Sequence, residues 1–538
     1  MRQPDALKRD EPLLWSPGCG VDVWAMFCAC VEGDVAAINR LLDKDPALVR
    51  CHYAYRTPIY FSVRENRLAV TELLLERGAD PLSLAVNDSL VQIARDRGYD
   101  EMLALLERSL RRLHGSSSRG EPIAAAIRAR DLPRVRAMLD DVPELLAVGD
   151  ARGNAPIHWA VMTRQIELID ELLARGADVN ARRFDGARPV QLTNGDYHYR
   201  GWRDVPRDVT VTPADVVAHL RQRGADVDIC TAAHAGDFER VKALLEQDPG
   251  LANRPSEYVT YYVGSGTPLR NAAATGDLRV VELLLEHGAD PNLPEEGIAP
   301  RGHALYAAAA AGHLEVARLL LDRGAYPNPP VESSADALTR AIDRGDEAMV
   351  ELLCSYGAAR SVEILAHYGD VRTAAAVFDA NPALADDPEG LASAAGQGHA
   401  SFVRLMLRHQ PNLARRTAVV AATRDLTELL LAHGMNLNQP DWLGITLLHE
   451  LARRGDRERA EVLLDHGADV HVRDEEICST PLGWAAKFGQ LEMARLLLDR
   501  GARSQLPEDP SWATPLAWAS RRGHAQVAEL LRGRGATA

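Results

Sequence analysis

The 538-residue sequence has little lysine and few aromatic residues, and its acidic residues outnumber its basic ones. Lysine occurs only at Lys8, Lys44, Lys242 and Lys487, so arginine supplies 57 of the 61 basic residues. This bias, with the heavy use of alanine, is typical of a GC-rich and therefore bacterial genome. The formal net charge is −15, which disfavours nucleic acid as a partner because phosphate contacts need clustered lysine and arginine.

Signals for export or membrane insertion are also missing. No stretch holds the roughly twenty consecutive apolar residues that cross a bilayer. Residues 1–20 carry charges and prolines where a secretory signal needs an apolar core. The seven cysteines are scattered and odd in number, which favours free thiols in a reducing compartment. We expect a cytoplasmic protein with no membrane partner.

Motifs of common catalytic and metal sites are absent as well. The sequence has no HExxH, no GxxxxGK[ST], no GxSxG and no EF-hand loop. Cys28 and Cys30, with Cys51 and His52 downstream, could be drawn as a metal site. However, the first two occupy places in a helix where small apolar side chains pack. We predict no catalytic residue, no metal and no cofactor.

What the sequence does contain is a repeat of 34 residues. TPLGWAAKFGQLEMARLLLDRGA at 480–502 returns at 514–536 as TPLAWASRRGHAQVAELLRGRGA, and a fainter copy precedes it at 446–468. Pro481 suits a first helical position, and Gly489 and Gly501 suit two helix ends. Two short helices cannot bury both apolar faces alone, so each pair must lean on the next.

The pattern TPLxxAAxxGxxxxARLLLxxGA resembles the ankyrin repeat, a family of hairpin-plus-two-helix units that bind other proteins. The resemblance implies an all-α solenoid of stacked helix pairs with short β-hairpin connectors. It also implies a non-catalytic protein–protein interaction scaffold with a long concave binding surface. We expect a monomer with one or more protein partners, whose identity the sequence does not give.

We count sixteen units in this sequence. Residues 1–21 form an irregular lead, 22–113 a first block, 114–120 a possible linker and 121–538 the main array. Because Gly176 and Gly224 lie 48 residues apart, about fifteen residues are inserted into one repeat, within 182–212.

A second irregularity is a region of short connectors. Residues 361–434 carry three helix-pair patterns, starting near Ser361, Glu389 and Arg415, with too little room for hairpins. We also expect the first and last units to be the weakest, because an end unit buries one face instead of two. Arg521, Arg522, Arg532 and Arg534 are expected to solvate the outward surface of the last unit.

Aromatic residues gather in the connectors, where the ankyrin resemblance places a partner-binding groove. Such side chains suit a binding hot spot because they offer large area at small entropy cost. The other interpretation is local packing onto their own repeat. We expect the 53–55 pair to pack locally and the 197–202 cluster to be exposed. The candidates are Tyr53, Tyr55, Tyr197, Tyr199, Trp202, Tyr258, Tyr261, Tyr262, Trp442 and Trp512.

Two other functions stay open at this point. The 182–212 insertion could hold an active site, with Asp196, His198 and Asp204 as its concentrated polar set. An acidic array could also act as a decoy or inhibitor of a basic partner. The histidines of the helix turns and helix starts, such as His399 and His449, are expected to make structural hydrogen bonds.

Overall fold

A computed structural model describes residues 1–14, 16–82, 84–85, 88–114, 118–183, 186–196, 199–256, 263–293, 303–328 and 336–536. Within these residues the chain is all-α, with thirty-one α-helices and one antiparallel pair of two-residue strands, β1 (Leu84–Ala85) and β2 (Asp88–Ser89). The predicted fold class is confirmed. Most connectors in the described part are turns rather than paired strands, and the 467–480 connector closes through one bond from Asp474 N to Ser479 O.

The helices fall into three sections along the chain. The N-terminal block, residues 1–114, contains η1 (Asp5–Lys8), α1 (Gly20–Glu32), α2 (Val35–Lys44), η2 (Pro46–Arg50), α3 (Pro58–Arg64), α4 (Leu68–Glu76), α5 (Leu90–Arg97) and α6 (Asp100–His114), where η marks a 3-10 turn. The middle section contains η3 (Ser118–Gly120), α7 (Glu121–Arg128), α8 (Leu132–Asp141), η4 (Pro143–Ala147), α9 (Pro156–Met162), α10 (Ile166–Ala174), η5 (Pro189–Leu192), α11 (Gly201–Asp204), α12 (Pro213–Gln222), α13 (Ile229–His234), α14 (Phe238–Gln247), η6 (Pro249–Asn253), α15 (Pro268–Thr275), α16 (Leu278–Glu286), α17 (Ala304–Ala311), α18 (Leu314–Asp322), α19 (Ala337–Asp343) and α20 (Glu347–Ser355).

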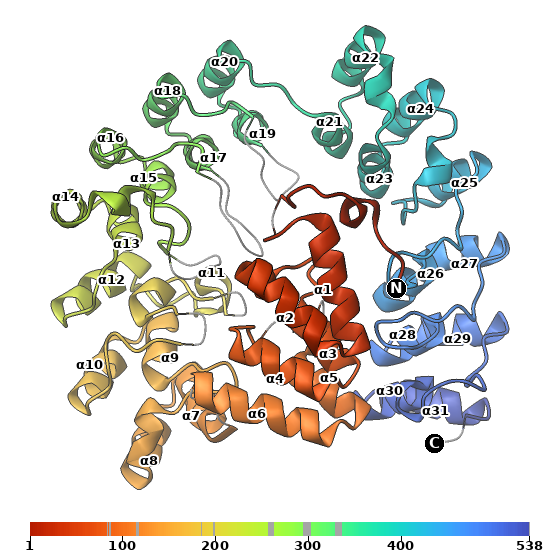
Figure 1. Cartoon of the computed structure of the whole chain (residues 1–538), viewed down its shortest axis with the longest axis horizontal. Helices are drawn as coiled ribbons and strands as arrows, with labels where there is room; N and C mark the ends of the chain where they lie inside the picture. The colour runs from red at the N-terminus through yellow and green to blue at the C-terminus, as the bar shows by residue number, and fades with distance from the viewer. Residues whose placement is uncertain are drawn as a thin grey trace.

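The C-terminal section completes the array. It contains α21 (Val362–Tyr368), α22 (Val371–Ala380), η7 (Pro382–Ala385), α23 (Pro388–Gln397), α24 (Ala400–His409), η8 (Leu413–Arg416), α25 (Arg424–Ala432), α26 (Leu447–Arg454), α27 (Arg457–Asp465), α28 (Pro481–Lys487), α29 (Leu491–Asp499), η9 (Ser511–Ala513), α30 (Pro515–Arg521) and α31 (Ala525–Gly533). In the middle and C-terminal sections the first helix of each pair lies on the inner side of a curved arc and the second on its outer side (Figure 1).

Neighbouring units are joined by a repeated side-chain bridge. The amide of Asn292 donates to Gly324 O (2.8 Å), and its oxygen accepts from Tyr326 N (2.7 Å) in the next unit. Each bridge satisfies a carbonyl and an amide that the end of an outer helix leaves without an intrahelical partner. The same pair of bonds is made by Asn180, Asn253, Asn328 and Asn438.

The histidines make the structural bonds expected of them. At helix starts, His449 Nδ1 accepts from Thr446 N (3.1 Å) while Nε2 lies 3.3 Å from Ser479 O. At helix turns, His399 Nε2 lies 2.9 Å from His367 O of the preceding unit. Because both ring nitrogens of His449 are used when the ring is neutral, this residue fixes the connector to the helix.

Two units depart from the helix-pair pattern. In the 182–212 insertion, η5 takes the first-helix place against α9, and the extra residues lie between η5 and α12. The helix pair predicted from Arg415 is wrong, since only α25 forms an α-helix there. Residues 417–422, TAVVAA, are short and rich in β-branched side chains, which disfavour a helix. Ala422 N instead donates to Ala395 O of α23 (2.8 Å).

Buried apolar side chains form two clusters rather than one continuous core. One cluster spans residues 123–358, whereas the other joins residues 7–106 to residues 365–531. The N-terminal block therefore shares its core with the end of the chain and not with the units that follow it. Within the proposed linker, residues 115–117 lie outside the described part.

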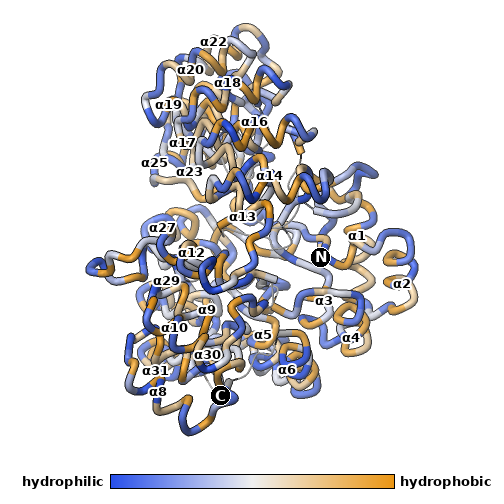
Figure 2. Tube along the Cα trace, turned by 90° about the vertical axis from the view of Figure 1, so that its left-hand side faces the viewer, coloured by the Kyte–Doolittle hydropathy of each residue, from blue (hydrophilic) through white to orange (hydrophobic). Residues whose placement is uncertain are grey.

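This division corresponds to the shape of the molecule. The N-terminal block lies within the arc formed by the later units, with α5 beside α28 and α30 (Figure 1). In the perpendicular view, α1 to α4 project to one side of the arc (Figure 2). The N-terminal block thus packs against the inner side of the last units, and the expectation that the first and last units are the weakest stays a prediction.

Candidate protein-binding surface

Trp442 forms an aromatic contact between the connector before α26 and the N-terminal block. Its ring centroid lies 5.4 Å from that of Tyr53, 5.9 Å from Phe61 and 6.2 Å from Phe27. Arg2 N also donates to Trp442 O (3.0 Å). Tyr53 and Trp442, both predicted as groove aromatics, therefore pack on each other across the contact between the N-terminal block and the last units. We call this contact the closure. Tyr53 contacts a distant unit rather than only its own repeat, so the expected local packing is corrected.

Trp512 has a similar place near the end of the chain. The guanidinium carbon of Arg97, at the end of α5, lies 4.5 Å from the Trp512 ring centroid. The same Arg97 donates to Glu476 O (2.7 Å) and to Arg64 O (2.6 Å). The other side of Trp512 packs edge-on against Trp518, with centroids 5.9 Å apart. Trp512 is thus covered by the N-terminal block in this structure.

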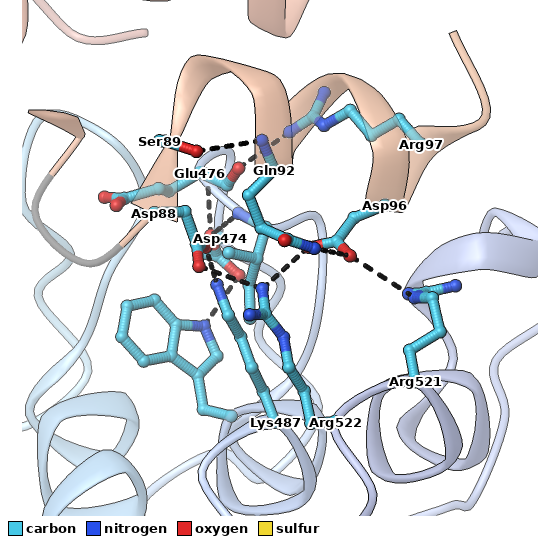
Figure 3. Close-up of polar contacts among 12 residues, drawn as sticks. Asp88, Ser89, Gln92, Asp96, Arg97, Asp474, Glu476, Lys487, Arg521 and Arg522 are labelled. Carbon is cyan, nitrogen blue, oxygen red and sulfur yellow. Dashed lines mark hydrogen bonds and ion pairs between the residues drawn. The ribbon is translucent and has the colours of Figure 1, made fainter. Parts of the chain in front are cut away.

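Charged side chains from the two ends of the chain also meet in this contact (Figure 3). Lys487 Nζ lies 2.5 Å from Asp88 Oδ2, and Arg522 reaches both Asp88 (2.9 Å) and Asp96 (2.7 Å). Arg521 Nε is 3.8 Å from Asp96. The expectation that Arg521 and Arg522 solvate an outward surface is wrong, because β2 and α5 bring the carboxylates of Asp88 and Asp96 to them. The other two arginines differ: Arg532 and Arg534 are exposed, and Arg534 pairs with exposed Asp499.

A second ion pair in the closure has the opposite polarity. Arg56 of the N-terminal block pairs with Glu476 of the connector before α28, and both side chains are about 10% exposed. Burial raises the pKa of Glu476, against the Arg56 charge that lowers it. Since acidic and basic groups alternate on each side, only one docking orientation pairs them all.

A small cavity of about 20 Å³ lies within this contact, large enough for one water molecule. The buried Tyr60 hydroxyl and the Trp518 indole N–H have no hydrogen-bond partner among the described residues. The residues that line the cavity come from both ends of the chain: Tyr60, Asp88, Ile93, Asp96, Arg97, Glu476, Ile477, Lys487, Trp512 and Trp518.

The insertion holds the other predicted aromatics that the structure describes. Tyr199 packs edge-on against core Trp159, with centroids 5.5 Å apart, and its hydroxyl donates to Asp204 O (3.2 Å). Trp202, on α11, is 68% exposed and lies beside Arg200, whose guanidinium carbon is 5.3 Å from the ring centroid. α11 lies on the inner side of the arc (Figure 1).

The remaining aromatic candidates are placed as follows. Tyr55 is 51% exposed and has a positive φ of 63° in the turn after Tyr53. The others, Tyr197, Tyr258, Tyr261 and Tyr262, lie outside the described residues.

The carboxylates that suggested an active site have structural roles. Asp196 is buried in an ion pair with Arg183 (2.9 Å) and accepts from Tyr199 N (2.8 Å). Asp204 pairs with Arg203 and accepts from Arg200 N (2.6 Å). His198 lies outside the described residues. The described part of this polar set therefore shapes the insertion and gives no support to the enzyme hypothesis.

Three arginines surround Tyr199, and sequence reasoning missed them. Burial raises the pKa of the Tyr199 hydroxyl, as does the charge of Asp204, whereas the charges of Arg130, Arg164 and Arg128 lower it. Arg128 lies 4.5 Å from the Trp159 ring centroid. Across the described residues, no carboxylate pairs with these three guanidinium groups.

Two of these arginines occupy an unusual backbone conformation. Arg130 and Arg164 have φ of 57° and 55° in the turns between paired helices, where most other units have glycine, for example Gly276 and Gly312. A non-glycine residue in the left-handed region costs about 1 kcal/mol. Arg164 also donates to Asn194 Oδ1 (3.2 Å), so part of that cost is offset.

Two kinds of feature are absent from the described residues. No helix there is long and apolar enough to cross a membrane, and no group of three or more His, Cys, Asp or Glu side chains is arranged to hold a metal ion. Cys30 and Cys51 are buried, and burial raises the pKa of both thiols, as expected for side chains that pack in a core.

The stacked helix pairs define a repeat protein of the solenoid class. A model of the ankyrin repeat matches residues 152–183, 266–296 and 303–330, and a model of three ankyrin repeats matches 391–474 and 448–537. Ankyrin repeats therefore make up the matched parts of the chain.

Curated relatives share only part of their length with this chain. They include the nuclear factor NF-kappa-B p105 subunit of Gallus gallus, 25% identical over 41% of this chain and 22% of the relative. The ankyrin repeat and KH domain-containing protein mask-1 of Caenorhabditis elegans is 28% identical over 43% and 10%. The probable E3 ubiquitin-protein ligase XBOS32 of Oryza sativa subsp. japonica is 31% identical over 32% and 39%. The chain thus spans less than half of each.

Proposed function

We propose that the chain is a non-catalytic, monomeric, cytoplasmic scaffold that binds a protein partner at the insertion on the inner side of the arc. The observation that supports this most is Trp202, a large aromatic side chain left 68% exposed on a short helix. An exposed tryptophan next to arginine is a composition typical of protein-binding hot spots. Tyr197, Tyr258, Tyr261 and Tyr262 remain candidates for the same surface.

The charges around the insertion suggest what the partner presents. Arg128, Arg130 and Arg164 gather near Tyr199, and no carboxylate of the described residues pairs with them. In a chain with a net charge of −15, such a cluster favours acidic side chains on the partner. Arginine also forms planar, bidentate bonds with carboxylates, which would orient the partner on Trp202.

Partner capture by the full chain tests this proposal. Trp202→Ala should weaken capture by about thirtyfold, the loss expected for a hot spot worth about 2 kcal/mol. Arg130→Gly with Arg164→Gly should also weaken capture while leaving stability nearly unchanged, because glycine relieves the left-handed strain as it removes the side-chain bonds. Tyr326→Ala, which removes a 61% exposed ring after outer helix α18, is the matched control. Equal capture by all four proteins would refute the proposal.

A further inference from the structure

The contact that closes the arc differs chemically from the contacts that stack the units. Stacked first helices such as α28 and α30 meet through buried apolar side chains, including Leu482, Ala485 and Leu516. The closure also has apolar packing, around Trp442, but in addition it buries Lys487 to 5% and Asp96 to 4% side-chain exposure. Buried ion pairs contribute little net stability because desolvation offsets their attraction, and polar interfaces are typical of parts that separate and rejoin.

The structure also shows what the surface of α28 and α30 accepts. α5 directs Leu90 and Ala94 into the core of its own block, whereas Asp96 meets the arginines of α30. Gln92 donates to Asp96 Oδ1 (2.7 Å) and so holds the carboxylate in place. Asp88, just before α5, meets Lys487 (Figure 3). The basic side chains thus recognise two carboxylates at the ends of one short helix.

We propose that the inner surface of α28 and α30, with Lys487, Arg521 and Arg522, is a docking surface for an acidic helical segment of a protein. α5 of the N-terminal block is its intramolecular occupant. A partner that presents carboxylates at a similar spacing competes with α5 and opens the arc. This surface is separate from the insertion, so the inference does not depend on the proposed partner site.

Charge reversal in the full chain tests whether these ion pairs hold the closure. In a first variant, Asp88→Lys and Asp96→Lys place positive charges against Lys487 and Arg522. Hydrogen exchange should then become at least about tenfold faster in both 90–97 and 481–487, because the unpaired buried charges favour separation. Glu72→Lys with Glu76→Lys on α4 is the control, since it changes the net charge equally at exposed sites.

A second variant carries the reversal on the other side, Lys487→Asp and Arg522→Asp. Its two surfaces should also exchange faster. Combining all four substitutions in one chain restores opposite charges, and slow exchange should return. This rescue separates loss of the ion pairs from simple misfolding, because a chain with four disruptive changes would not regain protection.

Mixing the two variants tests docking between molecules. The acidic α5 of the second variant matches the basic surface of the first, and the reversed charges match in the other direction. Sedimentation should show a 1:1 dimer in the mixture and monomers in each variant alone. Unchanged exchange in both single-side variants would overturn the proposal, and so would two open variants that never associate.

Discussion

Replacing Trp442 with alanine should separate the N-terminal block from the C-terminal units. The indole contacts the rings of Phe27, Tyr53 and Phe61, each within 6.2 Å between centroids. Aromatic pairs contribute about 0.5–1.5 kcal/mol each beyond the buried area, and truncating a core tryptophan costs about 3–5 kcal/mol. Because Trp442 is half-buried, we expect about 3 kcal/mol, the lower end of that range.

Native-state hydrogen exchange measures this loss where it occurs. Opening of the closure exposes α3 and the connector before α26 together, so amides in 58–64 and 441–446 should exchange roughly a hundredfold faster. Trp202→Ala should change the same amides little, because an exposed side chain costs within about 0.5 kcal/mol. If Trp442→Ala accelerates exchange no more than Trp202→Ala, the closure does not depend on this ring. A double-mutant cycle with Tyr53→Ala should give a coupling of about 1 kcal/mol.

Two further predictions concern the array. Asn292→Ala removes two inter-unit hydrogen bonds, so the Tyr326 amide should exchange about tenfold faster while the equivalent amide at the Asn438 bridge stays unchanged, as measured by hydrogen exchange. Burial lowers the pKa of His449 below its ordinary 6.5, so its contribution to stability is full above pH 6.5 and is lost as the pH falls through the lowered value. The urea midpoint followed by far-UV circular dichroism should therefore fall between pH 7.5 and 5.5 in the native chain, and less steeply in His449→Gln; equal slopes would contradict this assignment.

Local structure in this chain could be predicted because the residues that begin and end each helix lie within the same unit. Pro481 begins α28 at its first position, and Gly489 ends the pair's first helix with φ of 72°, as the sequence pattern indicates. A glycine is needed at that turn for a second reason, since a Cβ would lie 2.6 Å from the His524 ring of the next unit. Such constraints act within one unit or between two neighbours, so the same residue type recurs at the same place in most units.

No recurring sequence pattern predicts the closure. Asp88 and Lys487 are 399 residues apart, and they meet because small rotations between many stacked units add up to an arc. Neither the repeat period nor the spacing of residues in the sequence predicts this total rotation. Two residues could have suggested this contact: Lys487 is one of four lysines in the chain, and Asp96 is the one carboxylate in the segment 90–97, LVQIARDR. The arginines near Tyr199 were missed for a different reason, because two successive units, at the ends of α7 and α9, bring them to the insertion.

The closed arc changes how an ankyrin array responds to binding. In an open array each unit contacts only its neighbours, so a change at one end fades along the stack. Here the middle section, with its own core over 123–358, joins two parts of the second core, 7–106 and 365–531. If a partner at the insertion alters the curvature of the middle section, the distance between those two parts changes with it. The ion pairs of Asp88 and Asp96 must then lengthen or break, because packed cores shift between discrete arrangements rather than deform smoothly. In that case binding at Trp202 and opening at Lys487 are linked reciprocally, and a variant that opens the closure should change partner affinity by the same factor.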